Sequence, residues 1–139
     1  MSLLLDEDYE ILKNAGLDYE EDENSRFLIL KNFPLKENLY SYADEKLSDV
    51  EILIIIPANY NTSGNNMLWT HPELKRTDAK AIPAAFGFGQ IDARQHNGKE
   101  YCRWSRHYKP DSWKAKVDNI QKILDRIEWA LSNPDATKI

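Results

Sequence analysis

The sequence has 139 residues, of which 42% are hydrophobic and 29% are charged, the composition of a water-soluble globular protein. This length fits one domain of ordinary size, so we expect residues 1–139 to form a single domain. The formal net charge of −5 argues against nucleic acid as a partner, because phosphates repel an acidic surface. Cys102 is the only cysteine, which excludes an internal disulfide and favours a reducing compartment, and we expect the cytoplasm.

We expect neither an export signal nor a membrane span. The short apolar start of the chain is followed at once by the acidic residues 6–8, whereas a signal peptide has a basic start and a longer apolar stretch. The longest apolar run, residues 52–57, is far too short to cross a bilayer.

The first half of the chain predicts one helix followed by strands. Apolar residues at helical spacing predict a helix over residues 4–17, and an acidic connector follows over residues 18–25. Residues 26–33 favour a strand, and the polar residues 35–48 form a loop or a short strand. Residues 49–56 are apolar on both faces, as expected for a central strand that is covered on both sides.

The second half predicts shorter strands separated by loops. Residues 57–66 have the chemistry of an extended loop, and residues 67–69 form a short strand before His71 and Pro72. Residues 84–90 are expected to pair as another strand, and residues 92–99 to form a polar loop.

A long helix is expected near the C-terminus, because apolar residues recur there at steps of four and three. Asp111 or Ser112 is the expected N-cap, and Asn133 with Pro134 ends the helix. The apolar stripe consists of Trp113, Val117, Ile120, Leu124, Ile127 and Leu131.

The order of these elements predicts an α+β fold. We expect an N-terminal helix, an antiparallel meander of about four strands, an active-site loop and the long C-terminal helix. The lack of helices between the strands argues against a doubly wound parallel sheet.

Residues 97–107 gather a thiol, a hydroxyl, an imidazole and two guanidiniums in a short stretch before that helix. A thiol is nucleophilic only as the thiolate, and Arg103, Arg106 or His107 would favour that form of Cys102. The alternative for Cys102 is a small, buried hydrophobic residue.

Ser105 competes with Cys102 as the nucleophile. If the stretch is extended, Ser105 and His107 project to the same side, so His107 could accept the hydroxyl proton. The alternative is that Ser105, Arg106 and His107 hold the loop through hydrogen bonds. We expect no metal site, since His96, Cys102 and His107 match no strong zinc spacing.

Several motifs resemble one family over nearly the whole chain. Gly98 shortly precedes Cys102, and Trp113 and a helix follow; Arg-Trp-Ser-Arg-His stands unbroken at residues 103–107, and Asp118-Asn119-Ile120 begins the helix. The chain resembles the ubiquitin-conjugating enzyme superfamily, whose fold is called UBC or RWD-like, and more closely its prokaryotic family E branch.

The resemblance implies a transferase that carries a ubiquitin-like protein as a thioester on Cys102, or as an oxyester on Ser105. It would pass this protein to an acceptor in a bacterial conjugation pathway, and the implied setting is antiphage defence. It also implies an activating enzyme as the second partner and no cofactor. Asn97 is a candidate amide donor to the oxyanion, or else a turn residue before Gly98. The rival interpretation is a non-catalytic module that binds the ubiquitin-like protein or scaffolds the complex.

Overall fold

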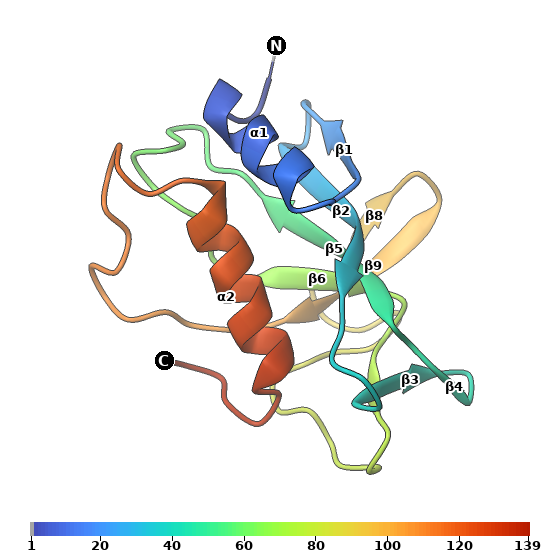
Figure 1. Ribbon diagram of the computed structural model, residues 1–139. Helices are drawn as coiled ribbons and strands as arrows, with labels where there is room; N and C mark the ends of the chain where they lie inside the picture. The colour runs from blue at the N-terminus through green and yellow to red at the C-terminus, as the bar shows by residue number, and fades with distance from the viewer. Residues whose placement is uncertain (1) are drawn as a thin grey trace.

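The computed structural model describes residues 2–139 and places two helices on one face of an antiparallel β-sheet (Figure 1). The fold is therefore α+β, as predicted. The elements are α1 (Asp6–Asn14), β1 (Tyr19–Asp22), β2 (Phe27–Pro34), β3 (Tyr40–Tyr42), β4 (Glu45–Lys46), β5 (Asp49–Ile55), β6 (Leu68–His71), β7 (Lys75–Arg76), β8 (Arg94–His96), β9 (Lys99–Trp104) and α2 (Ile120–Ser132).

The main sheet has six strands in the order β1-β2-β5-β6-β9-β8, and every neighbouring pair is antiparallel. Three of the predicted strands, β2, β5 and β6, are consecutive neighbours in this sheet, with β5 between β2 and β6. Ile52, Leu53 and Ile54 of β5 are fully buried, which confirms the prediction of a central strand covered on both faces.

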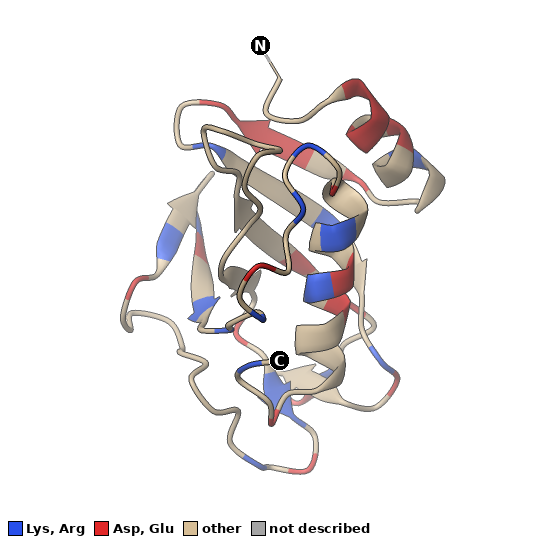
Figure 2. Ribbon diagram, turned by 90° about the vertical axis from the view of Figure 1, so that its left-hand side faces the viewer, with Lys and Arg blue, Asp and Glu red and all other residues tan. Residues whose placement is uncertain are grey.

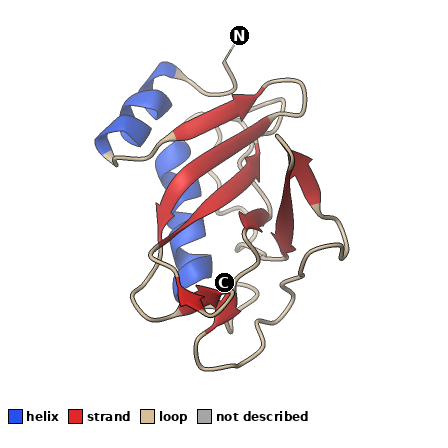
Figure 3. Ribbon diagram, turned by 90° about the vertical axis from the view of Figure 1, so that its right-hand side faces the viewer, coloured by secondary structure: helices blue, strands red, loops and turns tan. Residues whose placement is uncertain are grey.

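The sheet curls until its two edge strands meet. His96 of β8 lies 3.3 Å from Glu20 and 3.7 Å from Asp22, both in β1 at the opposite edge. Figure 3 shows β8 and β9 folded over at an angle to the remaining strands. The curl encloses a small core on the face turned away from α2, formed by Phe27, Ile29, Leu53, Trp69 and Tyr101.

The larger core lies between the sheet and α2. The buried residues of α2 follow the helical period. They pack against the face of the sheet opposite to the one that carries the small core. Tyr40 of β3 is fully buried in this core, and its hydroxyl donates a hydrogen bond to the Leu131 carbonyl (2.6 Å).

The C-terminal helix is shorter than predicted, because it begins at Ile120 and has 13 residues. Its N-cap is Asn119, whose side chain accepts a hydrogen bond from the Gln121 amide, so neither Asp111 nor Ser112 caps it. Val117 is 70% exposed and does not belong to the apolar stripe.

The prediction of a strand over residues 84–90 is wrong. Only Ala85 forms a bridge, to Trp104 at the end of β9, and the following residues turn away through Gly87 and Gly89. Three short strands were also missed. β1 lies within residues 18–25, which were predicted as a connector, and β8 lies within residues 92–99, which were predicted as a loop. β7 joins β3 and β4 in a separate three-stranded sheet.

Candidate functional site

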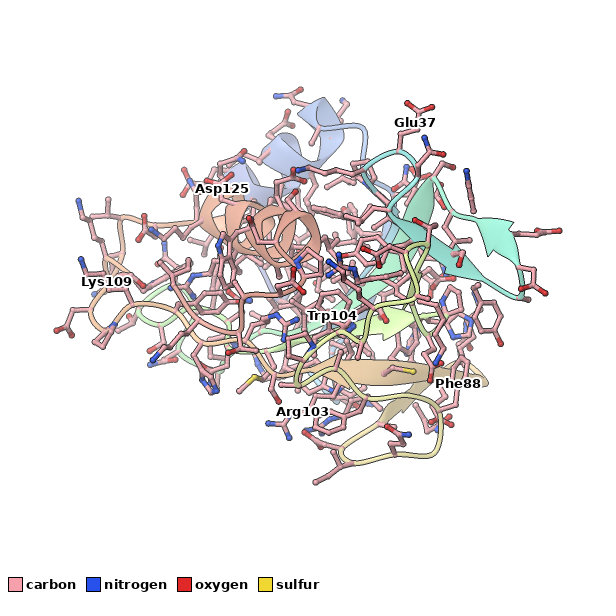
Figure 4. The ribbon with its side chains drawn as sticks, turned by 90° about the horizontal axis from the view of Figure 1, so that it is seen from below. Glu37, Phe88, Arg103, Trp104, Lys109 and Asp125 are labelled. Carbon is pink, nitrogen blue, oxygen red and sulfur yellow. The ribbon has the colours of Figure 1, made fainter. Side chains whose placement is uncertain are left out.

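Strand β9 carries Cys102 into the interior. Successive side chains alternate between the faces of the sheet, so Cys102 and Trp104 face one way and Tyr101 and Arg103 the other. Figure 4 shows Trp104 and Arg103 on opposite sides of β9. Cys102 is only 1% exposed.

The surroundings of Cys102 oppose its ionisation. Burial, and to a smaller extent the charges of Glu73 and Glu100, raise the pKa of the thiol to about 12, while Lys75 acts in the opposite direction. The expected activation by Arg103, Arg106 and His107 is therefore absent in this conformation. At neutral pH the thiol is protonated.

The two carboxylates near Cys102 also fasten the loop beside it. Glu73 Oε1 accepts a hydrogen bond from the Phe88 amide (3.2 Å), and the Glu100 carboxylate accepts one from the Gly89 amide. Gly87 lies so close to Glu73 that a Cβ there would meet its carboxylate. Residues 84–90 are thus fixed along the edge of β9 next to the thiol.

Ser105 follows β9 directly and is half-buried. Its amide donates to the Ala84 carbonyl (2.8 Å), so its backbone takes part in fastening the same segment. His107 is exposed, and its backbone pairs with the C-terminal residues 137–139. Both residues are fully described, and the Ser105 hydroxyl forms no hydrogen bond with the His107 ring.

Arg106 acts as a clamp inside the molecule. It is 1% exposed, stacks 4.8 Å above the Trp104 ring, and donates to the carbonyls of Pro83 (3.0 Å) and Pro134 (3.2 Å). Burial lowers the pKa of its guanidinium. These contacts tie the end of β9 to the turn that follows α2, which matches the alternative in which Arg106 holds the loop.

Two further candidates lie away from the thiol. Arg103 forms an ion pair with Asp92 (3.0 Å) on the other face of the sheet. Asn97 occupies the tip of the β8–β9 hairpin with φ 54°, followed by Gly98 with φ 79°, which confirms it as a turn residue. The strand from Lys99 to Cys102 alone spans about 10 Å, so Asn97 at the hairpin tip is not placed to serve an oxyanion there.

A polar pocket of about 410 Å³ lies where the loop before β6, the segment after β9 and helix α2 meet. Residues 62–66, residues 106–109 and 111–113, and Arg126 of α2 line it. We call it the Arg126 pocket. Figure 2 views the molecule from this side, with cationic positions on α2 and on the neighbouring loop, whereas acidic residues gather over α1 and β1.

Three residues of this pocket were missed from the sequence: Asn65, Tyr108 and Arg126. The sequence gives a signal for Arg126 alone, because it lies between Leu124 and Ile127 of the apolar stripe. A cation that is buried among apolar residues needs hydrogen-bond or charge partners. Asn65 and Tyr108 carried no signal, since only the fold brings their segments to α2.

A family model described as Prokaryotic E2 family E matches residues 4–134, which contain both helices and all the strands. The chain belongs to this family. Comparisons with curated proteins and with solved structures gave no match for this family E chain.

Two further observations concern the part of this family E chain that the structure describes. None of its helices is long and apolar enough to cross a membrane. Among residues 2–139, no group of three histidine, cysteine, aspartate or glutamate side chains is arranged to hold a metal ion.

Proposed function

We propose that this family E protein carries a ubiquitin-like modifier in a bacterial conjugation pathway, receiving it from an activating enzyme and passing it to an acceptor. The observation that supports the proposal is the family match over residues 4–134. The resemblance at residues 103–107 adds to it, since that motif follows Cys102 directly.

The carrier step is an exchange of thioesters. The Cys102 thiolate attacks the carbonyl carbon that joins the modifier to the activating enzyme; a new C–S bond forms, and the activating enzyme's thiolate leaves. Because Cys102 is buried and protonated in the described conformation, this step requires a movement that exposes the thiol. We place that movement at residues 84–90, which pair with the end of β9. Release of the loop from Glu73 and Glu100 would expose the thiol to water and so reduce the burial that is the largest cause of its raised pKa.

The burial of Cys102 favours a second candidate function, a non-catalytic module that binds the modifier. In that case β9 keeps its thiol as a core side chain, and the surface of the domain supplies the contacts. Ser105 offers a third outcome, an oxyester, because its half-buried hydroxyl is closer to solvent than the thiol.

One assay separates these possibilities. The protein is incubated with its activating enzyme, ATP and the ubiquitin-like partner, and adducts are resolved with and without reductant. We expect a reductant-sensitive adduct that Cys102→Ala abolishes and Ser105→Ala retains. A reductant-resistant adduct lost only in Ser105→Ala would identify the oxyester, and binding without any adduct would leave the non-catalytic module.

The required loop movement has its own test, which needs no partner. In Glu73→Gln/Glu100→Gln the loop loses two charge-assisted hydrogen bonds and the thiol loses two charges that raise its pKa, so we expect iodoacetamide to alkylate Cys102 at least about tenfold faster at neutral pH. Glu45→Gln, an exposed glutamate of β4, is the matched control and should label like the wild type. Equal rates in all three proteins would show that these carboxylates do not control access.

A further inference from the structure

The Arg126 pocket contains a buried cation that has no acidic partner. Arg126 is only 7% exposed. Its Nη1 donates to the Asn65 carbonyl (2.9 Å) and side-chain oxygen (3.3 Å), and its Nη2 donates to Ser112 Oγ (3.1 Å). All these partners are neutral, and among residues 2–139 no carboxylate forms an ion pair with this guanidinium.

A buried charge without a counterion is unfavourable, and proteins normally pair it. Burial accordingly lowers the pKa of Arg126, although Tyr108 and then Asp118 act in the opposite direction. The three hydrogen bonds leave part of the guanidinium's five N–H groups available. The side chain is therefore able to bind an anion without losing its present contacts.

Two more hydrogen-bond donors in the Arg126 pocket have no partner. Asn65 is 3% exposed, and its Nδ2 has no hydrogen-bond partner among the described residues; the same holds for the Tyr108 hydroxyl. Burial raises the pKa of the Tyr108 hydroxyl, and the charge of Arg126 and then the nearby Asn65 side chain act in the opposite direction. Unsatisfied buried donors beside an unpaired cation favour an acceptor as the missing partner.

The pocket is rigidly built, so its donors are held in place. Arg126 lies between two aromatic rings, 4.1 Å from the centre of Tyr108 and 5.4 Å from that of Trp113. Gly64 passes so closely over Trp113 that a Cβ would lie 2.2 Å from the ring. Fixed donors bind an anion better than mobile surface lysines do, because less side-chain entropy is lost.

We propose that the Arg126 pocket is a binding site for a small oxyanion, a phosphate or a carboxylate, held by the guanidinium of Arg126, the Asn65 amide and the Tyr108 hydroxyl. Lys109 at the rim adds positive charge, and Asp111 is the one acidic residue of the lining. The site is separate from the buried thiol, and it does not depend on the carrier function.

The test is an NMR titration of the whole protein that follows the indole N–H of Trp113. Inorganic phosphate is the first probe, and sodium chloride at matched ionic strength is its control. The carboxylate arm uses acetyl-Gly-Gly and compares it with the corresponding amide. We expect saturable shifts with phosphate or with the peptide acid, in the millimolar range or tighter, and none with chloride or the amide.

Substitutions then locate the site. Arg126→Gln should weaken binding at least about tenfold, since a charge-assisted hydrogen bond is lost. Lys122→Gln removes the same charge one turn away on α2 and should bind like the wild type. Tyr108→Phe keeps the ring beside Arg126 and should bind a few-fold more weakly, which provides a readout even if Arg126→Gln folds poorly.

The outcomes also distinguish the source of the anion. Tighter binding of phosphate would identify a phosphate group as the ligand, and tighter binding of the peptide acid would identify a chain-terminal carboxylate. A wild-type protein that shows no saturable shift with either probe, or variants that bind as well as the wild type, would overturn the proposal.

Discussion

At the scale of single residues, the position of Cys102 in β9 determines when its thiol ionises. Burial, together with the charges of Glu73 and Glu100, raises the pKa of the folded thiol from 9.0 to about 12. Between pH 9 and pH 12 the Cys102 thiol therefore loses its proton in the unfolded chain but keeps it in the folded protein. The protonated thiol therefore adds stability that is complete below pH 9 and is lost as the pH rises towards 12.

We expect the free energy of unfolding of the wild type to fall between pH 9 and 12 relative to that of Cys102→Ala. The difference between their slopes should approach about 1.4 kcal/mol per pH unit, the effect of one proton. Urea denaturation across this range measures it, and the slope is the readout because the substitution itself causes a constant offset. Parallel curves would contradict the raised pKa.

Local chemistry determined which single residues were predictable. Asn97 could be recognised as a turn residue, because Asn before Gly supplies the two positive φ angles that a tight hairpin needs. The partners of Arg126 could not, because Asn65 is 61 positions away along the chain. For Cys102 the sequence left two alternatives open, an activated thiol and a small buried residue, and only the position of its side chain in the folded sheet decides for burial.

At the scale of the elements, one buried carboxylate serves both helices. Asp8 accepts a hydrogen bond from the Leu5 amide before α1 and another from the Ile120 amide at the start of α2, each 2.9 Å long. Asp8 is fully buried, so no water can replace it. The two helix starts are thereby fixed to each other.

Asp8→Ala would leave both amides without a partner, and we expect it to lower the free energy of unfolding by roughly 2–4 kcal/mol. Asp6→Ala, two residues earlier and exposed, is the control and should cost less than about 1 kcal/mol. Urea denaturation of the two variants gives the comparison. Similar losses in both would mean that the buried contact is not special.

The elements that could be predicted are those with a strong pattern of their own. The apolar runs of β2 and β5 are sufficient to define strands, and helix periodicity identified α2 from Ile120 onwards. β1 and β8 are polar and short, and they are strands only because β2 and β9 pair with them. The segment before α2 is not helical, because Asp118 accepts a hydrogen bond from the Lys114 amide in a separate turn.

At the scale of the whole molecule, a network of charges joins the strands of the curled sheet. Glu51 of β5 contacts Lys31 of β2 (3.2 Å), and on β9 it contacts Lys99 (2.6 Å) and the Tyr101 hydroxyl (2.7 Å). Burial raises the pKa of Glu51, but hydrogen bonds from Lys99, Tyr101 and Lys31 outweigh it, and the pKa is lowered. This closure was not predicted, since the sequence indicates an antiparallel meander but not the curl of the sheet.

Glu51→Gln should lower the free energy of unfolding by about 1–3 kcal/mol at pH 7, because two lysines and a tyrosine lose a charged acceptor. A carboxyl with a lowered folded pKa adds stability above its ordinary value of 4.5 and loses it as the pH falls through the folded value. The difference from the wild type should therefore shrink below pH 4.5 in acid denaturation curves. A difference that does not change with pH would exclude this role.

The four tryptophans lie in the two cores and beside the Arg126 pocket. Trp69 lies in the small core, Trp104 in the large one and Trp113 beside the pocket, while Trp129 packs against Tyr108. The chain thus contains four intrinsic fluorophores, one in the small core and three in or against the large core. Variants that keep one indole at a time would reveal the sequence in which these regions loosen during unfolding, without any attached dye.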